Sequence, residues 1–111
     1  MLEGNFITVK SELLIRHIQL FMKNKLSYTV LIDYIWEILH DWQILNVVDS
    51  KIASQKEQIF WYLIFELQLQ DEKHLLSNKI LNLKLNHCML FLQGQVDMPN
   101  DCVGVRPNRL R

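Results

Sequence analysis

The chain has 111 residues, of which 50% are hydrophobic and 22% charged, and its formal net charge at pH 7 is zero. This length suits one domain, and this composition excludes a largely disordered chain. Three glycines and two prolines are too few for the many turns of a β-sandwich or barrel. We therefore expect an all-α fold, an up-and-down bundle of four to five helices.

The first helix is expected over about residues 8–24, with Thr8 as its N-cap. Apolar residues at three- and four-residue spacing define one face, and Asn24, which tolerates the left-handed conformation, ends the helix. The inward residues of this helix are Leu14, Ile18, Phe21 and Met22.

Ser27 is expected to cap a second helix that reaches about Leu45. Its core stripe is Leu31, Ile35, Ile38, Leu39, Trp42 and Leu45.

Three acids follow one another on the opposite side of this second helix, at positions i, i+4 and i+8: Asp33, Glu37 and Asp41. Val30 and Ile44 project among them, which is unusual for a purely solvated face. This side of the helix is either an ordinary wet surface or a partner site.

The third helix begins with the capping box Ser54-Gln-Lys-Glu57 and runs to about Gln70. It is apolar on two faces, so it lies centrally or meets a partner. One face carries Phe60, Leu63, Ile64 and Leu67, and the other carries Trp61, Tyr62, Phe65 and Leu69.

Residues 71–76 continue the helical path, and Ser77-Asn78 is a break or a new cap before the last helix. That helix ends near Gln93, before Gly94, with Ile80, Leu83, His87, Leu90 and Phe91 expected to point inward. We expect a single domain over 1–111, with the bundle at about 8–93. Residues 94–111 would form an extended tail that crosses the bundle through Met98, Val103 and Val105.

The middle of the chain is strongly acidic, because eight acids oppose two lysines over residues 33–72 and give this segment a charge of −6. The flanking segments carry +2 and +4. Such asymmetry typically steers a partner of opposite charge. The acids outside the second helix include a possible second patch: Glu66, Asp71 and Glu72.

Two Glu/Asp-x-x-His pairs, Glu37 with His40 and Asp71 with His74, resemble halves of a di-iron site. No inward glutamate on another helix completes the set, so we expect no metal and no other cofactor. Cys88 lies beside His87, but adjacent helical residues point about 100° apart and cannot form a nucleophile–base pair. No known catalytic motif occurs, and we expect no enzymatic activity.

The N-terminus lacks the basic and apolar regions of a secretory signal, and the longest apolar run, Ile59 to Phe65, is far shorter than a membrane span. We expect a cytoplasmic protein that binds neither membrane nor, being neutral, nucleic acid. Cys88 and Cys102 lie 14 residues apart without a CxxC pattern, so we expect reduced, structural thiols.

Trp36, Trp42 and Trp61 fit either core packing or a partner anchor, since tryptophan is common in both. Trp42 lies in line with the core stripe and is assigned to packing. Trp36 lies on the acidic side of its helix, which makes it our preferred anchor.

Three segments, LFMKNKLSYTVLIDYIW, FWYLIFELQ and FLQGQVDMPNDCVGVRP, together resemble small helical bacterial immunity proteins. The comparison is with the immunity proteins of contact-dependent growth inhibition and of colicin-D-type toxins. The resemblance implies a cytoplasmic protein that binds a cognate toxin domain, such as a nuclease, and covers its active site or substrate groove. This chain is neutral, whereas such proteins are commonly acidic.

The expected function is therefore inhibition of a toxin by a monomer that forms a 1:1 complex. The expected partner-binding residues are Asp33, Trp36, Glu37, Asp41, Glu66, Asp71 and Glu72. The alternative is a helical adaptor or secretion chaperone that forms a homodimer through its two-faced third helix.

Overall fold

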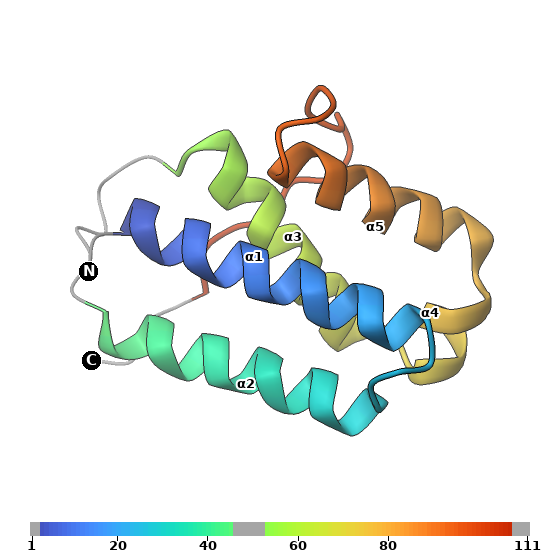
Figure 1. The fold of residues 1–111 in the computed structure, drawn as a ribbon. Coiled ribbons are helices and arrows are strands. Elements are labelled where there is room, and N and C mark those ends of the chain that lie inside the picture. The colour runs from blue at the N-terminus through green and yellow to red at the C-terminus, as the bar shows by residue number, and fades with distance from the viewer. Residues whose placement is uncertain (1–2, 46–52, 108–111) are drawn as a thin grey trace. The chain divides into compact units, whose positions relative to one another are not determined.

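The computed structural model describes residues 3–45 and 53–107 (Figure 1). This part of the chain forms five helices and no strand, so the predicted all-α class is confirmed. The helices are α1 (Glu3–Met22), α2 (Tyr28–Ile44), α3 (Gln55–Leu69), α4 (Glu72–Ser77) and α5 (Lys79–Leu92).

The chain divides into two compact units. The first is Met1–Ala53 with Pro107–Arg111 and contains α1 and α2, and the second is Ser54–Arg106 and contains α3, α4 and α5. Each unit is described by itself below. The single-domain organisation expected from the sequence stays a prediction.

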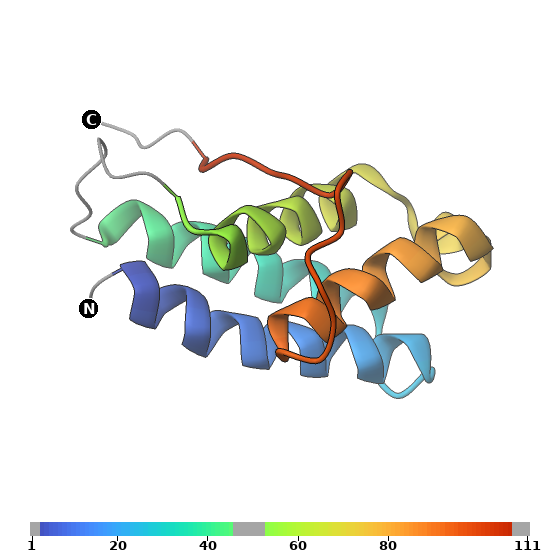
Figure 2. The same ribbon diagram turned by 90° about the horizontal axis from the view of Figure 1, so that it is seen from above.

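In the first unit, α1 and α2 lie side by side and run in opposite directions (Figures 1 and 2). The prediction that α1 begins at Thr8 was wrong, because the helix already includes Glu3 and Thr8 is an exposed residue within it. Phe6 and Ile7 are 2% and 4% exposed, so they extend the apolar face of α1 towards the N-terminus. Burying these two side chains stabilises the longer helix by more than the roughly 1 kcal/mol that an N-cap at Thr8 would contribute.

The end of α1 follows the predicted pattern. Asn24 has a positive φ of 59°, its N–H donates to the Phe21 carbonyl at 3.0 Å, and the Lys25 N–H donates to the Leu20 carbonyl at 2.8 Å. These two bonds form a Schellman motif, which satisfies carbonyls at the end of the helix. Ser27 then caps α2, its side chain accepting from the Val30 N–H at 3.2 Å.

The second unit starts at the predicted capping residue Ser54, whose side chain accepts from the Glu57 N–H at 3.1 Å. One predicted face of α3 is fully buried, since Phe60, Leu63, Ile64 and Leu67 have no exposed area. On the other face only Trp61 is fully buried, Tyr62 and Phe65 are half-buried, and Leu69 is 77% exposed. The two interpretations offered by the sequence, a central helix or one that meets a partner, therefore both stay predictions.

The inward face predicted for α5 was wrong for three of its five residues. Ile80 and Leu83 are each 71% exposed and His87 is exposed, whereas Leu90 and Phe91 are half-buried. The buried residues of the helix are Leu81, Leu85, Cys88 and Met89. The helix is apolar on two sides, so periodicity alone selected the wrong one. Its predicted end is confirmed, because Gly94 has a φ of 78° and closes a second Schellman motif.

After α5, residues 93–106, named here the return segment, run back along α3 (Figure 2). The predicted tail thus lacks helix and strand as far as 107, and its remainder, 108–111, lies outside the described residues. Its expected apolar anchors were mostly wrong, since Val103 and Val105 are 50% and 73% exposed and Met98 is half-buried.

The return segment is attached to α3 by polar contacts and by close backbone approach. The Gly104 N–H donates to the Gln58 carbonyl at 2.9 Å. A Cβ at Gly104 would lie 2.6 Å from the carbonyl carbon of Trp61, so only glycine fits there. Arg106 forms a two-pronged ion pair with Glu57, its Nη2 donating to Oε1 at 2.9 Å and its Nε donating to Oε2.

Candidate partner-binding surface

The acids predicted on α2 do share its outward side. Asp33 and Glu37 are exposed and Asp41 is half-buried, whereas the core stripe on the other side of the helix is fully buried at Leu31 and Ile38. Residues four apart on a helix lie one above the other, which explains why the carboxylates form a line.

Large apolar side chains lie between these acids. Val30, Trp36 and Ile44 are 44%, 59% and 71% exposed. Trp36 is the most informative of them, because Trp61 and Trp42 have no exposed area and only Trp36 can reach a partner. We call this surface the α2 strip; it consists of Val30, Asp33, Trp36, Glu37, Asp41 and Ile44.

The carboxylates of the α2 strip are not equally available. Asp41 accepts from the Lys10 ammonium of α1 at 2.7 Å, and their side chains are only 32% and 16% exposed. Asp33 and Glu37 form no ion pair within residues 3–45 and 53–107. The strip therefore offers two open carboxylates and a third that is already neutralised.

Sequence reasoning missed a ring pair beside the strip. His17 of α1 stacks on Tyr34 of α2, with ring centroids 4.0 Å apart and an interplanar angle of 6°. Burial, followed by the nearby carboxylates of Glu37 and Asp41, raises the pKa of Tyr34 well above its ordinary value. Tyr34 lies three residues before Glu37 and seven before Asp41, so helical spacing places it beside them.

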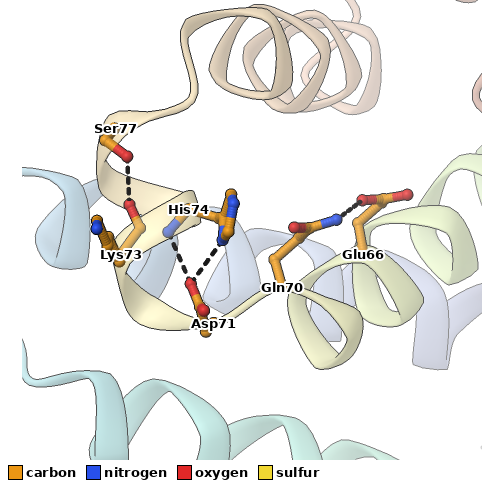
Figure 3. Close-up of polar contacts among 6 residues, drawn as sticks. All are labelled: Glu66, Gln70, Asp71, Lys73, His74 and Ser77. Atoms are coloured by element: carbon orange, nitrogen blue, oxygen red, sulfur yellow. Dashed lines mark hydrogen bonds and ion pairs between the residues drawn. The ribbon is translucent and has the colours of Figure 1, made fainter.

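The second predicted patch lies in the other unit and is occupied by local interactions (Figure 3). Glu66 accepts from the Gln70 side-chain amide at 3.3 Å. Asp71 caps α4, its carboxylate accepting from the His74 N–H at 2.8 Å and lying 2.9 Å from His74 Nδ1. Glu72 lies in the first turn of α4, where an acid is favourable for the helix dipole.

The cap explains the electrostatics of Asp71. The hydrogen bond from the His74 backbone, and then the one from its side chain, lowers the pKa of the Asp71 carboxyl. Both Asp71 and Glu72 remain exposed, so a role in binding a partner stays a prediction for this patch. Helix capping alone accounts for the positions of both acids.

The acidic segment also contains a carboxylate that is not on the surface. Glu57 is 2% exposed, and besides Arg106 it accepts from Trp61 Nε1 at 3.1 Å. The charge of −6 counted from the sequence therefore overstates the field at the surface. No sequence signal identifies Arg106 as the partner, because it lies 49 residues away.

The two acid–histidine pairs that resemble halves of a di-iron site, Glu37 with His40 and Asp71 with His74, gain no further ligands among the described residues. Asp71 and His74 touch each other, but in the described residues no three side chains of His, Cys, Asp or Glu gather as a cation would require. Within the same residues, none of the helices has the length and hydropathy needed to cross a bilayer.

Comparisons with known proteins add no assignment. No model of a protein family, no curated protein and no solved structure matches this chain.

Proposed function

We propose that this protein is an immunity-type inhibitor that binds a toxin domain one-to-one through the α2 strip and covers a basic groove on it. The observation that carries the proposal is that two open carboxylates, Asp33 and Glu37, share one exposed helix side with Trp36. The resemblance of the sequence to small helical immunity proteins supports the same function. The site of action would be the cytoplasm of the cell that makes the toxin.

The chemistry of the strip suits a partner whose groove binds phosphates. Such a groove is lined with lysine and arginine, as in a nuclease, and carboxylates would both attract it and take the place of phosphate. Exposed carboxylates mainly raise the association rate and select the partner. Trp36, with Val30 and Ile44 beside it, would supply the apolar contact that slows dissociation.

The test is the affinity for the cognate toxin domain, which this function predicts to be encoded next to this protein, measured by isothermal titration calorimetry. The double reversal Asp33→Lys and Glu37→Lys places like charges against the basic groove, so we expect a loss of about 100-fold or more. Trp36→Ala should lose about 30-fold, which corresponds to about 2 kcal/mol. Asp41 is left unchanged because its substitution would also break the ion pair with Lys10.

A matched control changes the net charge by the same amount elsewhere. Glu12 and Asp97 are exposed and lie outside the α2 strip, so Glu12→Lys with Asp97→Lys should alter affinity by less than about threefold. Circular dichroism checks that every variant keeps its helices. Equal losses in the two double variants would show that net charge alone, and not the strip, governs binding.

The homodimeric adaptor remains the second candidate, but burial weighs against its expected interface. Most apolar side chains of α3, including Trp61, Leu63 and Ile64, have no exposed area, which leaves the half-buried Tyr62 and Phe65 and the 77% exposed Leu69 to contact a second copy. Size-exclusion chromatography with light scattering separates the two functions: the inhibitor is a monomer without its toxin, whereas the adaptor is a stable dimer.

A further inference from the structure

The end of the return segment binds α3 through a small group of directed contacts. The Gly104 N–H donates to the Gln58 carbonyl at 2.9 Å. Arg106 engages both carboxylate oxygens of Glu57, its Nη2 donating to Oε1 at 2.9 Å and its Nε donating to Oε2. Trp61 Nε1 also donates to Oε2, at 3.1 Å. All the partners on α3 lie in its first two turns, so the segment ends in one short binding site.

Most of the return segment buries little apolar surface. Between residues 93 and 106 only Pro99 and Cys102 are buried, whereas Val103 and Val105 are exposed. Separation of the segment from the second unit therefore loses the burial of two side chains together with the polar contacts.

The site on α3 is selective for the residues that occupy it. Glu57 is 2% exposed, and a buried carboxylate that loses its cation is strongly destabilising, so the occupant must supply a guanidinium. A Cβ at position 104 would overlap the backbone of α3, so the occupant must also carry glycine two residues before the arginine. Gly104 and Arg106 meet both conditions, and no other glycine of this chain is followed by arginine at that spacing.

The chain between α5 and this site has the length and the freedom to reach another molecule. Gly94 ends α5, and residues 95–103 contain neither helix nor strand. The ten residues from Gly94 to Gly104 span about 33 Å when extended. Their ion pair to α5, between Lys84 and Asp101 at 3.3 Å, is exposed and therefore contributes little stability. Opening of the segment requires less free energy than unfolding of α5.

We infer that the return segment also binds in trans, so that two copies of the chain exchange it and form a symmetric dimer. Arg106 of each copy pairs with Glu57 of the other copy, and Gly104 approaches the other copy's α3. Both copies give and receive the same segment. The exchange therefore closes after two molecules and does not produce an open chain of copies.

The tether sets the concentration at which exchange occurs. A segment on a short flexible connection is held near its own site at an effective concentration of about 1 mM. A second copy offers identical contacts, so the dimer competes with the monomer only near that concentration. At micromolar concentrations the monomer prevails. The inference is independent of the proposed inhibitor function, whose α2 strip lies in the first unit.

The first experiment examines the unmodified protein by size-exclusion chromatography with light scattering. Samples are incubated at 37 °C until the distribution no longer changes. We expect about half of the chains in dimers at about 1 mM and monomers alone at about 10 μM. Dimers that are isolated and diluted should return to monomers. A protein that stays monomeric at 1 mM would overturn the inference.

Two substitutions show whether the exchanged ion pair holds the dimer. Arg106→Met removes the guanidinium, and Glu57→Gln replaces the carboxylate by an amide whose oxygen still accepts from Trp61, so neither variant alone forms the pair. In an equal mixture, Arg106 of one variant meets Glu57 of the other only in trans. At about 0.1 mM we expect at least fivefold more dimer in the mixture than in either variant alone. Equal amounts of dimer in all three samples would show association without exchange.

The matched control replaces Arg106→Met by the double variant Glu57→Gln with Arg106→Met. Its mixture with Glu57→Gln contains no carboxylate at position 57, so we expect no gain of dimer. If Arg106→Met does not fold alone, its helical circular dichroism should appear when Glu57→Gln is added. Absence of both this signal and the heterodimer would contradict binding in trans.

Discussion

At the scale of single residues, the described part of the chain shows two opposite ways to bury a polar group. Glu57 is almost fully buried and is satisfied by Trp61 and Arg106. The hydroxyl of Tyr34 is also buried, but it has no hydrogen-bond partner among the described residues. Removing one partner of a buried ion pair costs several kcal/mol, whereas removing an unsatisfied hydroxyl costs nothing or stabilises the fold.

Tyr34→Phe therefore should fold without loss. The ring keeps its stack on His17, and we expect the free energy of unfolding in urea to stay equal or to rise by up to about 1 kcal/mol. Ser54→Ala is the control, because it removes a hydroxyl that does accept a hydrogen bond, from the Glu57 N–H at 3.1 Å, and its loss should cost about 1 kcal/mol. A loss in Tyr34→Phe as large as that in Ser54→Ala would mean that the Tyr34 hydroxyl is bonded.

At the scale of helices, most caps could be predicted, although Thr8 was wrong, and the orientation of an ambiguous helix could not. Ser27, Ser54, Asn24 and Gly94 act as predicted, since a cap depends only on residues within one turn. The buried side of α5 depends on which of two apolar stripes finds a neighbour. That choice is made by tertiary packing, and periodicity contains no information about it.

The cap of α4 gives a prediction about pH. The pKa of Asp71 is lower in the folded protein than its ordinary value, so its charge stabilises the fold above about pH 4, and this contribution is lost as the pH falls through the lowered pKa. Asp71→Ala should therefore reduce the free energy of unfolding most at pH 7 and least near pH 2. Urea titrations at both values measure the difference.

Asp33→Ala is the control for this effect. It removes the same charge from an exposed position inside α2, where the side chain caps nothing. If Asp71→Ala lowers the free energy of unfolding equally at pH 7 and at pH 2, the negative charge of Asp71 does not contribute to the cap.

At the scale of the whole molecule, the asymmetry of charge is visible in the sequence, but its distribution on the surface is not. Two of the eight acids between residues 33 and 72, Asp41 and Glu57, are neutralised by Lys10 and Arg106, which lie 31 and 49 residues away. Contacts over such separations follow no local pattern. The sequence therefore predicts that α2 carries an acidic side, and the structure decides which of its carboxylates are open.

The proposed inhibitor function gives a prediction at this scale. Two open carboxylates on the α2 strip should accelerate the encounter with a basic partner, and salt should screen that attraction. In stopped-flow measurements we expect the association rate constant to fall by about tenfold between 0.05 and 0.5 M NaCl, with a smaller change in the dissociation rate. The Asp33→Lys and Glu37→Lys double variant should lose this dependence. An association rate that ignores salt in the unmodified protein would contradict electrostatic steering.

The close approach of Gly104 to α3 makes the end of the return segment useful for spectroscopy. Gly104 faces the helix backbone and Arg106 reaches Glu57, while Val103 and Val105 between and beside them are directed to solvent. A fluorophore or spin label attached at 103 or 105 would therefore leave the contact between the segment and α3 undisturbed, and it would report when the segment separates from the helix. The same label at 104 would clash with the backbone of α3 and push the segment away from the helix. Labels at 103 and 105 therefore serve as probes, and the label at 104 is the positive control for a displaced segment.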